Sequence, residues 1–121
     1  MASKPRFIMC TCTGECPGFK NVNFWKLLNF VRNELDVEYA VIHPQLCVDD
    51  GERFLEDLLR PEVKLVIGAC DPRMQKKMLR DAFEKKGIAF EDTVVALDLR
   101  NMTTEEAMAK VKEAMDGTRN E

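Results

Sequence analysis

The sequence predicts an α/β fold: one three-layer domain around a mostly parallel, four-stranded sheet. Three observations lead to this expectation. Short runs rich in β-branched and aromatic residues alternate with longer runs whose apolar residues recur at helical spacing. The third short run, VKLVIGAC (63–70), is apolar almost throughout, which is typical of a central parallel strand covered on both faces. The chain has 121 residues, 45% of them hydrophobic and 32% charged, and this suits a single globular domain.

The strands are expected at four places, each followed by a helical run. This order of strand and helix, repeated four times, favours right-handed crossovers that place helices on both faces of the sheet. The expected arrangement is therefore Rossmann-like or flavodoxin-like. The expected strands are RFIMC (6–10), EYAVIH (38–43), VKLVIGAC (63–70) and TVVALDL (93–99).

The first two helices are predicted from their apolar spacing. The first is expected over about Asn23 to Leu35, and the second is expected to stop before Pro61, since proline disfavours continuation of a helix. The apolar positions are Phe24, Leu27, Leu28, Val31 and Leu35 in the first helix, and Phe54, Leu55, Leu58 and Leu59 in the second.

The third helix is the clearest, within DPRMQKKMLRDAFEKKG (71–87). Asp71 suits the N-cap, Pro72 the first turn and Gly87 the C′ position. Its inner stripe is expected to belong to the core rather than to a cofactor site. That stripe consists of Met74, Met78, Leu79, Ala82 and Phe83.

The last helix is predicted from a capping box and a terminal glycine. Thr103 and Glu106 have the spacing of the box, and the helix is expected to close near Gly117. Its apolar positions are Ala107, Met108, Val111 and Met115.

The chain is expected to be one domain over residues 1–121, with flexible ends at about 1–5 and 117–121. No apolar run approaches the roughly 20 residues of a membrane helix, and MASKPRF (1–7) has no apolar region of a signal peptide. The net charge of −3 gives no footprint of nucleic-acid binding. We therefore expect a cytoplasmic protein with no membrane insertion and no nucleic-acid partner.

Three of the five cysteines stand close together in FIMCTCTGECPGF (7–19), at Cys10, Cys12 and Cys16. The odd total and the lack of an export signal argue against a secreted disulfide framework. In a reducing compartment, clustered thiols favour metal binding or redox chemistry.

The predicted topology brings distant cysteines to one edge of the sheet. Cys10 ends the first strand and Cys12 follows it, Cys47 lies after the second strand, and Cys70 ends the third. The carboxyl edge of a parallel sheet is where open α/β folds place their ligands. We therefore expect a site at that edge. Against it stands a structural interpretation, in which each cysteine is a small buried hydrophobic residue.

Four thiolates at one point can hold a 4Fe–4S cluster or tetrahedral zinc. In an extended segment, residues i and i+2 point to the same side, so Cys10 and Cys12 could both be ligands. Zinc sites usually contain paired C-x2-4-C knuckles, whereas here single cysteines come from distant loops, which favours the cluster. Cys10, Cys12, Cys47 and Cys70 are the candidate ligands, and Cys16 is the alternative.

A thiol-redox or persulfide enzyme is the rival class. Cys70 directly precedes a predicted helix start, where the helix dipole stabilises a thiolate. The sequence after Cys70 is not a C-x5-R phosphate loop, and CTGEC (12–16) is not the C-x2-C of thioredoxin-like proteins. The lone histidine, His43, is expected to be structural, and Arg73 could offset negative charge or contact a partner.

With these residues in view, the sequence resembles the N-terminal domain of the A subunit of heterodisulfide reductase, an iron–sulfur flavoprotein. The resemblance spans about Phe7 to Asn101. It rests on the segments FIMCTC, LCVDDGERFL and GACDPRMQKKMLRDAFEKKGI, and more loosely on DLR (98–100). The family pattern usually has Gly directly after C-x-C, whereas here Thr13 precedes Gly14, and Cys16 is additional.

The resemblance implies a small α/β unit that holds a 4Fe–4S cluster through Cys10, Cys12, Cys47 and Cys70, with Cys16 as a possible replacement for Cys12. It also implies redox partners, among them flavin- or ferredoxin-containing subunits. Because the resemblance stops before the family's flavin domain, we expect any flavin or disulfide reduction to belong to another chain. The expected role is electron transfer by a non-catalytic subunit; the alternatives are a zinc-stabilised scaffold or regulatory domain and a thiol enzyme using Cys70.

Overall fold

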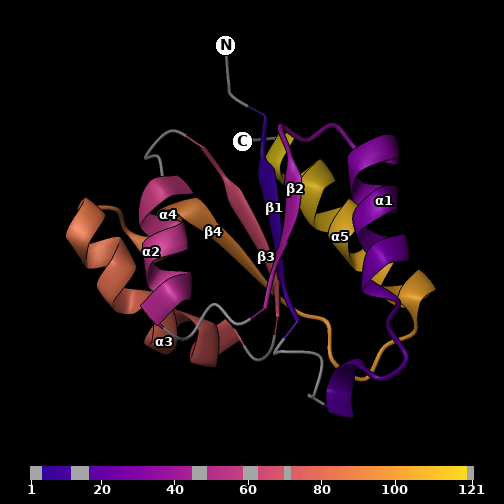
Figure 1. The fold of residues 1–121 in the computed structure, drawn as a ribbon. Coiled ribbons are helices and arrows are strands. Elements are labelled where there is room, and N and C mark those ends of the chain that lie inside the picture. The colour runs from indigo at the N-terminus through magenta and orange to yellow at the C-terminus, as the bar shows by residue number, and fades with distance from the viewer. Residues whose placement is uncertain (1–3, 12–16, 45–48, 59–62, 70–71, 120–121) are drawn as a thin grey trace.

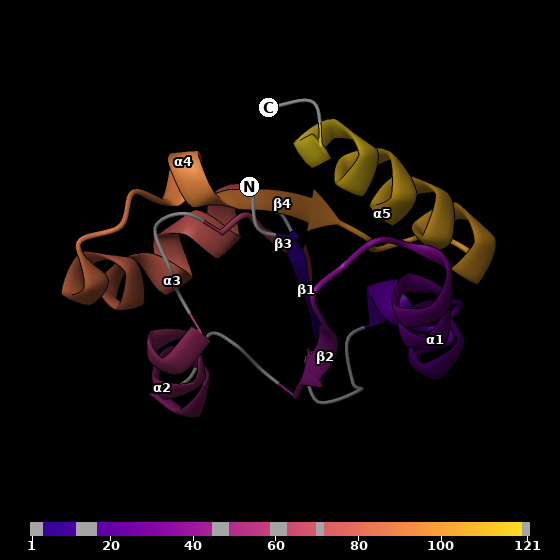
Figure 2. The ribbon, with the colours of Figure 1, turned by 90° about the horizontal axis from the view of Figure 1, so that it is seen from above.

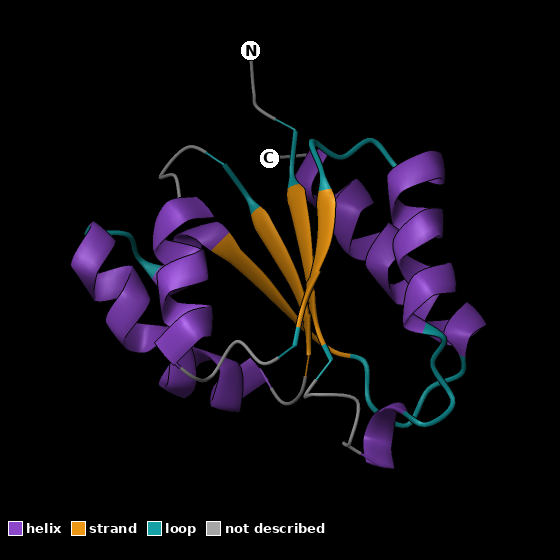
Figure 3. Cartoon of the chain, in the orientation of Figure 1, coloured by secondary structure: helices purple, strands orange, loops and turns teal. Residues whose placement is uncertain are grey.

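A computed structural model describes residues 4–11, 17–44, 49–58, 63–69 and 72–119. Four parallel strands form one sheet in the order β2-β1-β3-β4 (Figures 1 and 3). The predicted four-stranded parallel sheet is therefore confirmed. Its strands are β1 (Arg6–Cys10), β2 (Ala40–His43), β3 (Leu65–Ala69) and β4 (Val94–Asp98).

Helices cover both faces of the sheet, as expected. Seen from above, α1 and α5 lie on one face, while α2 and α3 lie on the other (Figure 2). The three layers are thus helix, sheet and helix. The helices are α1 (Phe24–Glu34), α2 (Asp49–Leu58), α3 (Pro72–Lys86), α4 (Phe90–Thr93) and α5 (Thr104–Arg119), and a 3-10 helix covers Pro17–Phe19. Among the described residues, no helix combines the length and the apolar character needed to cross a membrane.

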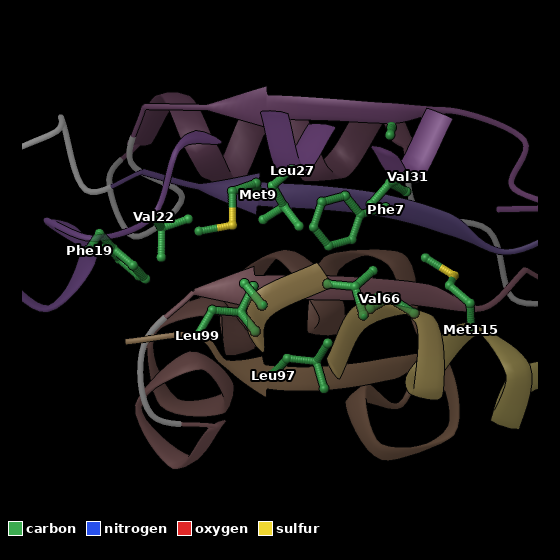
Figure 4. Close-up of a cluster of buried hydrophobic side chains, with 13 residues drawn as sticks. Phe7, Met9, Phe19, Val22, Leu27, Val31, Val66, Leu97, Leu99 and Met115 are labelled. Atoms are coloured by element: carbon green, nitrogen blue, oxygen red, sulfur yellow. The ribbon is translucent and has the colours of Figure 1, made fainter. Parts of the chain in front are cut away.

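The alternation of β1 divides the core into two clusters. Phe7 and Met9 point to the α1–α5 layer (Figure 4), whereas Ile8 and Cys10 belong to the cluster under α2 and α3. Neighbouring side chains on a strand point to opposite faces, which explains this division. Because all four side chains are buried, β1 is a central strand in packing as well as in order.

Gly68 in β3 allows the α1–α5 cluster to close on the sheet. A Cβ atom at this position would lie 2.6 Å from Leu99 Cδ1 and 3.0 Å from Met9 Sδ. Leu99 and Met9 are both buried, so neither has open space to move into. The glycine is therefore required by close packing.

The structure shows caps at the starts of α1 and α5, and the capping box predicted for α5 is confirmed. Asn23, which was expected inside the first helix, is the N-cap of α1, and its side chain accepts from the Lys26 amide. In the capping box of α5, the Thr103 amide donates to Glu106 Oε1 at 2.9 Å, and the Glu106 amide donates to Thr103 Oγ1 at 3.2 Å. Pro72 begins α3, while its expected N-cap, Asp71, lies outside the described residues.

Gly87 ends α3 in the left-handed conformation, with φ of 66°. The Gly87 amide donates to the Glu84 carbonyl and the Ile88 amide donates to the Phe83 carbonyl, which is the Schellman pattern. The predicted terminator is therefore confirmed. Gly117 behaves differently, because α5 continues through it and ends at Arg119, close to the expected position but not at the glycine itself.

The remaining differences from expectation are small. Strands β2, β3 and β4 are each shorter than their apolar runs, and α4 and the 3-10 helix were not expected. Of the inner stripe of α3, Leu79, Ala82 and Phe83 are buried as predicted, while the side chains of Met74 and Met78 lie outside the described part.

Candidate functional site

The carboxyl ends of the four strands lie together at one edge of the sheet. Cys10 ends β1 and is the register partner of His43, which ends β2. Ala69 ends β3 beside Asp98, which ends β4. Helices α1, α3 and α5 all begin at this end of the sheet (Figure 1). The edge therefore combines strand ends with helix amino ends, the usual ligand-binding position of an open parallel sheet.

The strand order creates a switch point between β1 and β3. From this pair, the chain continues outward to β2 on one side and to β4 on the other. Crossover connections then leave on opposite faces, so a crevice opens outside the carboxyl ends of the two central strands. Cys10 ends one of these strands, and Cys70 is the residue after Ala69, which ends the other. The topology thus places the Cys10 thiol at the carboxyl edge of the sheet, where the sequence predicted a site.

Cys10 is buried, with 5% of its surface exposed. It shares its cluster with Ile8 of the same strand and with Ile67 and Ala69 of β3. A buried thiol in apolar surroundings suits both a structural residue and a ligand shielded from water. Its place at the last position of β1 favours the ligand interpretation, since the side chain is the final one on that face before the chain leaves the sheet.

His43 lies beside Cys10 on the same face of the sheet. Its ring is 5.0 Å from the Phe54 ring of α2, at an interplanar angle of 42°. It is 5% exposed, so the ring is a packed element of the α2 layer, in keeping with its expected structural role. Because paired strands are separated by about 4.8 Å, His43 is also the nearest titratable neighbour of Cys10 across the β1–β2 ladder.

The backbone immediately after Cys10 is held by β2. The Thr11 amide donates to the His43 carbonyl at 3.1 Å, and Thr11 Oγ1 donates to the Pro44 carbonyl at 3.4 Å. The Thr11 N–H therefore completes the β1–β2 ladder.

The other candidate ligands, Cys12, Cys47, Cys70 and the alternative Cys16, lie outside the described residues. Their positions in the chain are fixed by the neighbouring elements: two follow β1, one falls between β2 and α2, and one follows β3. Within the described part of the chain, no three His, Cys, Asp or Glu residues are arranged to hold a metal ion. Cys10 is the one cysteine of the five in that part, so the binding of a metal centre by four thiolates stays a prediction.

The donor set itself fits a thiophilic centre. Four cysteines follow or end strands that the structure places side by side, and thiolates are the preferred ligands of iron–sulfur clusters and of structural zinc. Helix α3 begins at Pro72, two residues after Cys70, so the positive end of its dipole lies at this edge. A centre of anionic thiolates is stabilised by such a helix end.

An ion pair borders the edge on the β4 side. Arg100 donates from Nε to Asp98 Oδ1 at 3.0 Å and from a terminal nitrogen to Asp98 Oδ2 at 2.8 Å. The Arg100 amide also donates to Asp98 Oδ1. These hydrogen bonds from Arg100 hold the pKa of Asp98 below its ordinary value. Asp98 is therefore a fixed anion with a structural partner rather than a candidate proton carrier.

The same loop holds the described end of the segment after β1. The Asn101 amide donates to the Gly18 carbonyl at 2.6 Å, and a Cβ at Gly18 would lie 2.9 Å from Arg100 Cβ. Asn101 has a positive φ of 61°, which asparagine tolerates better than most residues. The 3-10 helix is thus fixed on the β4–α5 loop. Sequence reasoning noticed DLR (98–100) only as part of a resemblance, because nothing local in the sequence links it to Gly18.

The polar residues at the start of α3 have separate roles. Gln75 is buried, and its Nε2 donates to the Leu97 carbonyl at 3.1 Å, which ties α3 to β4. Arg73 is exposed in the first turn, at the edge where it was expected to offset charge or contact a partner. The role of Gln75 is therefore structural, and the role of Arg73 remains a prediction.

Trp25, which sequence reasoning passed over, is the exposed large hydrophobic side chain of the described part, with 71% of its surface accessible. Trp25 lies outside the apolar stripe of α1, and this position in the sequence could have predicted its exposure.

Neither a scan of protein-family models nor a search of curated proteins finds a match to this chain. The resemblance to heterodisulfide reductase therefore remains an expectation drawn from the motifs alone.

Proposed function

We propose that this chain is a cytoplasmic iron–sulfur protein that transfers electrons within a heterodisulfide-reductase-like redox complex. Cys10, Cys12, Cys47 and Cys70 are the proposed ligands of a 4Fe–4S cluster, with Cys16 as the alternative to Cys12. The partners are redox proteins, including flavin- or ferredoxin-containing subunits. The chain itself carries no proposed catalytic residue.

One observation carries the proposal. Cys10 ends a central strand at the switch point of a parallel sheet, next to the strand that Cys70 follows in the sequence. Cysteines scattered at random among buried positions would have no preference for this edge. Since ligands of open α/β folds bind there, thiols from three separate connections at one edge favour a shared centre.

The cluster, when bound, supplies a one-electron change in charge, and the residues of the chain set how easily that change occurs. Burial of Cys10 excludes water from one sulfur and lowers the local dielectric constant. The amino end of α3 offsets the added negative charge. We expect amide donors to the sulfurs in the loop from Thr11 to Pro17 and at the start of the third helix, from Asp71 to Arg73. Within that loop, the Thr11 amide is bonded to His43.

Two other functions use the same cysteines. A zinc-stabilised scaffold or regulatory domain would use the four thiolates for structure alone. A thiol-redox or persulfide enzyme would use Cys70, activated by the start of α3, together with Cys10, Cys12 or Cys16. The cluster is preferred because the cysteines come from several separate connections rather than from paired knuckles.

Anaerobic purification separates the three functions. The visible spectrum is recorded, and iron, zinc and acid-labile sulfide are assayed per chain. A brown protein with a broad visible band and about four irons supports the cluster. A colourless zinc protein supports the scaffold. Metal-free protein with one rapidly alkylated thiol would overturn the cluster and support the enzyme.

A further inference from the structure

The outer face of α1 presents a narrow stripe of three exposed residues, Trp25, Asn29 and Arg32. We call it the Trp25 stripe. At 3.6 residues per turn, the spacing i, i+4 and i+7 places these residues within about 60° of one another around the helix. The buried residues of the helix, Leu27 and Val31, face the sheet instead. The stripe therefore points away from the core.

Trp25 buries little of its side chain in the fold. Its side chain is 71% exposed, although a tryptophan can remove roughly 150–250 Å² from water when it is buried. The neighbouring Phe24 packs edge-on against Phe19 at 5.6 Å and so belongs to the core side of α1. The chain contains a single tryptophan, and the structure leaves it in solvent.

The stripe itself carries one charge, that of Arg32. The sequence of α1, FWKLLNFVRNE, contains no carboxylate before its last residue, Glu34, and by helical geometry Glu34 lies on the opposite side of the helix from Trp25. Lys26, beside the stripe, is paired with Glu105 of α5 at 3.3 Å. Arg32 forms no ion pair with any residue in the described part of the chain. The stripe thus has a positive charge in a chain whose net charge is −3.

We propose that the Trp25 stripe is a docking site for an acidic surface of a partner protein, which receives Trp25 in an apolar pocket and pairs a carboxylate with Arg32. Tryptophan and arginine are the residue types most enriched among interface hot spots. A carboxylate and a guanidinium form a bidentate pair, which gives such a contact direction. A polyanion such as nucleic acid is disfavoured, since its binding rests on many phosphate contacts and the stripe offers one cation.

The position of the stripe determines what a bound partner would approach. The first turn of α1 lies at the carboxyl end of the sheet, the end to which Cys10 belongs (Figure 1). A protein bound at Trp25 is therefore at the same end of the domain as the proposed centre, although α1 covers the face of the sheet opposite the Cys10 side chain. The docking proposal stands without the cluster, because all three residues lie on a helix that packs through Leu27 and Val31.

The test is selection of a random 12-residue peptide library, displayed on phage, against the full chain. Enriched peptides should be acidic with at least one apolar residue. Titration of a synthetic enriched peptide should shift the emission of Trp25 to shorter wavelength, and because the chain has one tryptophan this signal reports on the site itself. Trp25→Ala should weaken peptide affinity, measured by calorimetry, at least tenfold.

Charge reversal provides the matched comparison. Arg32→Glu should weaken peptide binding at least tenfold, whereas Arg80→Glu should change it less than twofold. Both arginines are exposed and the two variants have equal net charge, but Arg80 lies on α3 in the other helical layer. Basic or neutral enriched peptides, or equal effects of the two reversals, would overturn the proposal.

Two further measurements exclude other occupants. The affinity for a 20-nucleotide single-stranded DNA is compared with that for the enriched peptide. If the DNA binds ten times more tightly and Trp25→Ala abolishes its binding, the proposal is overturned in favour of nucleic acid. Self-association in sedimentation velocity that Trp25→Ala abolishes would overturn it in favour of a second copy. Metal analysis of the same preparations reports on the cluster independently, so failure of either proposal is recognised separately.

Discussion

Arg100 holds the carboxylate of Asp98 through two side-chain hydrogen bonds, at 3.0 and 2.8 Å, where β4 ends. Both side chains are about one-third exposed, so solvent weakens the pair. The pair nevertheless joins the β4–α5 loop to the 3-10 helix, since Arg100 also packs on Gly18. Its effect on stability is therefore a direct measure of how firmly the β4–α5 loop is fixed.

Asp98→Asn is expected to lower the free energy of unfolding by about 1 kcal/mol at pH 7, a modest value because the pair is partly solvated. The pKa of Asp98 is lowered in the folded protein, so its contribution is present above the unfolded pKa of about 3.9 and is lost as the pH falls through the folded value. Urea denaturation should therefore show the difference from wild type shrinking as the pH falls below about 4. A difference that persists undiminished would show that the carboxylate charge is not the cause.

Gly68→Ala is expected to destabilise the protein by about 1–3 kcal/mol, because the new methyl group would collide with Leu99 and Met9 in a filled core. Gly117→Ala is the matched control, since nothing lies within 4 Å of its Cβ position inside α5. The control should be neutral or more stable by up to about 1 kcal/mol, through helix propensity. Thermal unfolding of both variants checks this, and equal effects would refute the packing argument.

Thr104→Val is expected to cost about 1 kcal/mol, because it removes hydrogen bonds that are only partly buried. Thr104 is 7% exposed; its hydroxyl accepts from the Asn23 amide at 2.9 Å and donates to the Asn21 carbonyl at 3.4 Å. Valine keeps the shape and removes both bonds. Thr104→Ser, which keeps the hydroxyl, should lose less stability in chemical denaturation; the reverse order would assign the effect to the methyl group.

Single substitutions of the proposed ligands should abolish cluster binding, whereas Cys16→Ser should retain it. Cys10 needs two variants, because serine places a hydroxyl in the apolar cluster of Ile67 and Ala69 whereas alanine does not. Iron and sulfide are assayed per folded chain, with folding checked by circular dichroism. Loss of the cluster in the Cys16 variant alone would refute the assignment.

Much of the fold could be predicted from local patterns. The span of β1 was predicted to the residue, and the expectation that the third strand is covered on both faces is confirmed, since all five residues of β3 are buried. Two glycines show where local reasoning ends. Gly87 and Gly117 have the same intrinsic preference, but only Gly87 adopts a positive φ and closes a Schellman motif with Ile88. A helix ends where its last carbonyls find partners, and that is not a property of glycine alone.

The candidate site was predictable to a lesser degree. The edge that Cys10 occupies followed from the strand order, because parallel strands bring their carboxyl ends together. The contact of Arg100 with Gly18 and the bond from Thr11 to His43 join segments far apart in the sequence. No periodicity or spacing encodes such contacts, so they became visible only in three dimensions.

The layer formed by α1 and α5 has a consequence for synthesis on the ribosome. Its core joins Phe7 and Met9, near the start of the chain, to Val111 and Met115, near its end. The other layer is complete once β4 has been made, at Asp98. A nascent chain therefore holds an apolar sheet face that only α1 covers until its last helix is made. This interval is the stage at which the protein most needs a chaperone or slow, orderly translation.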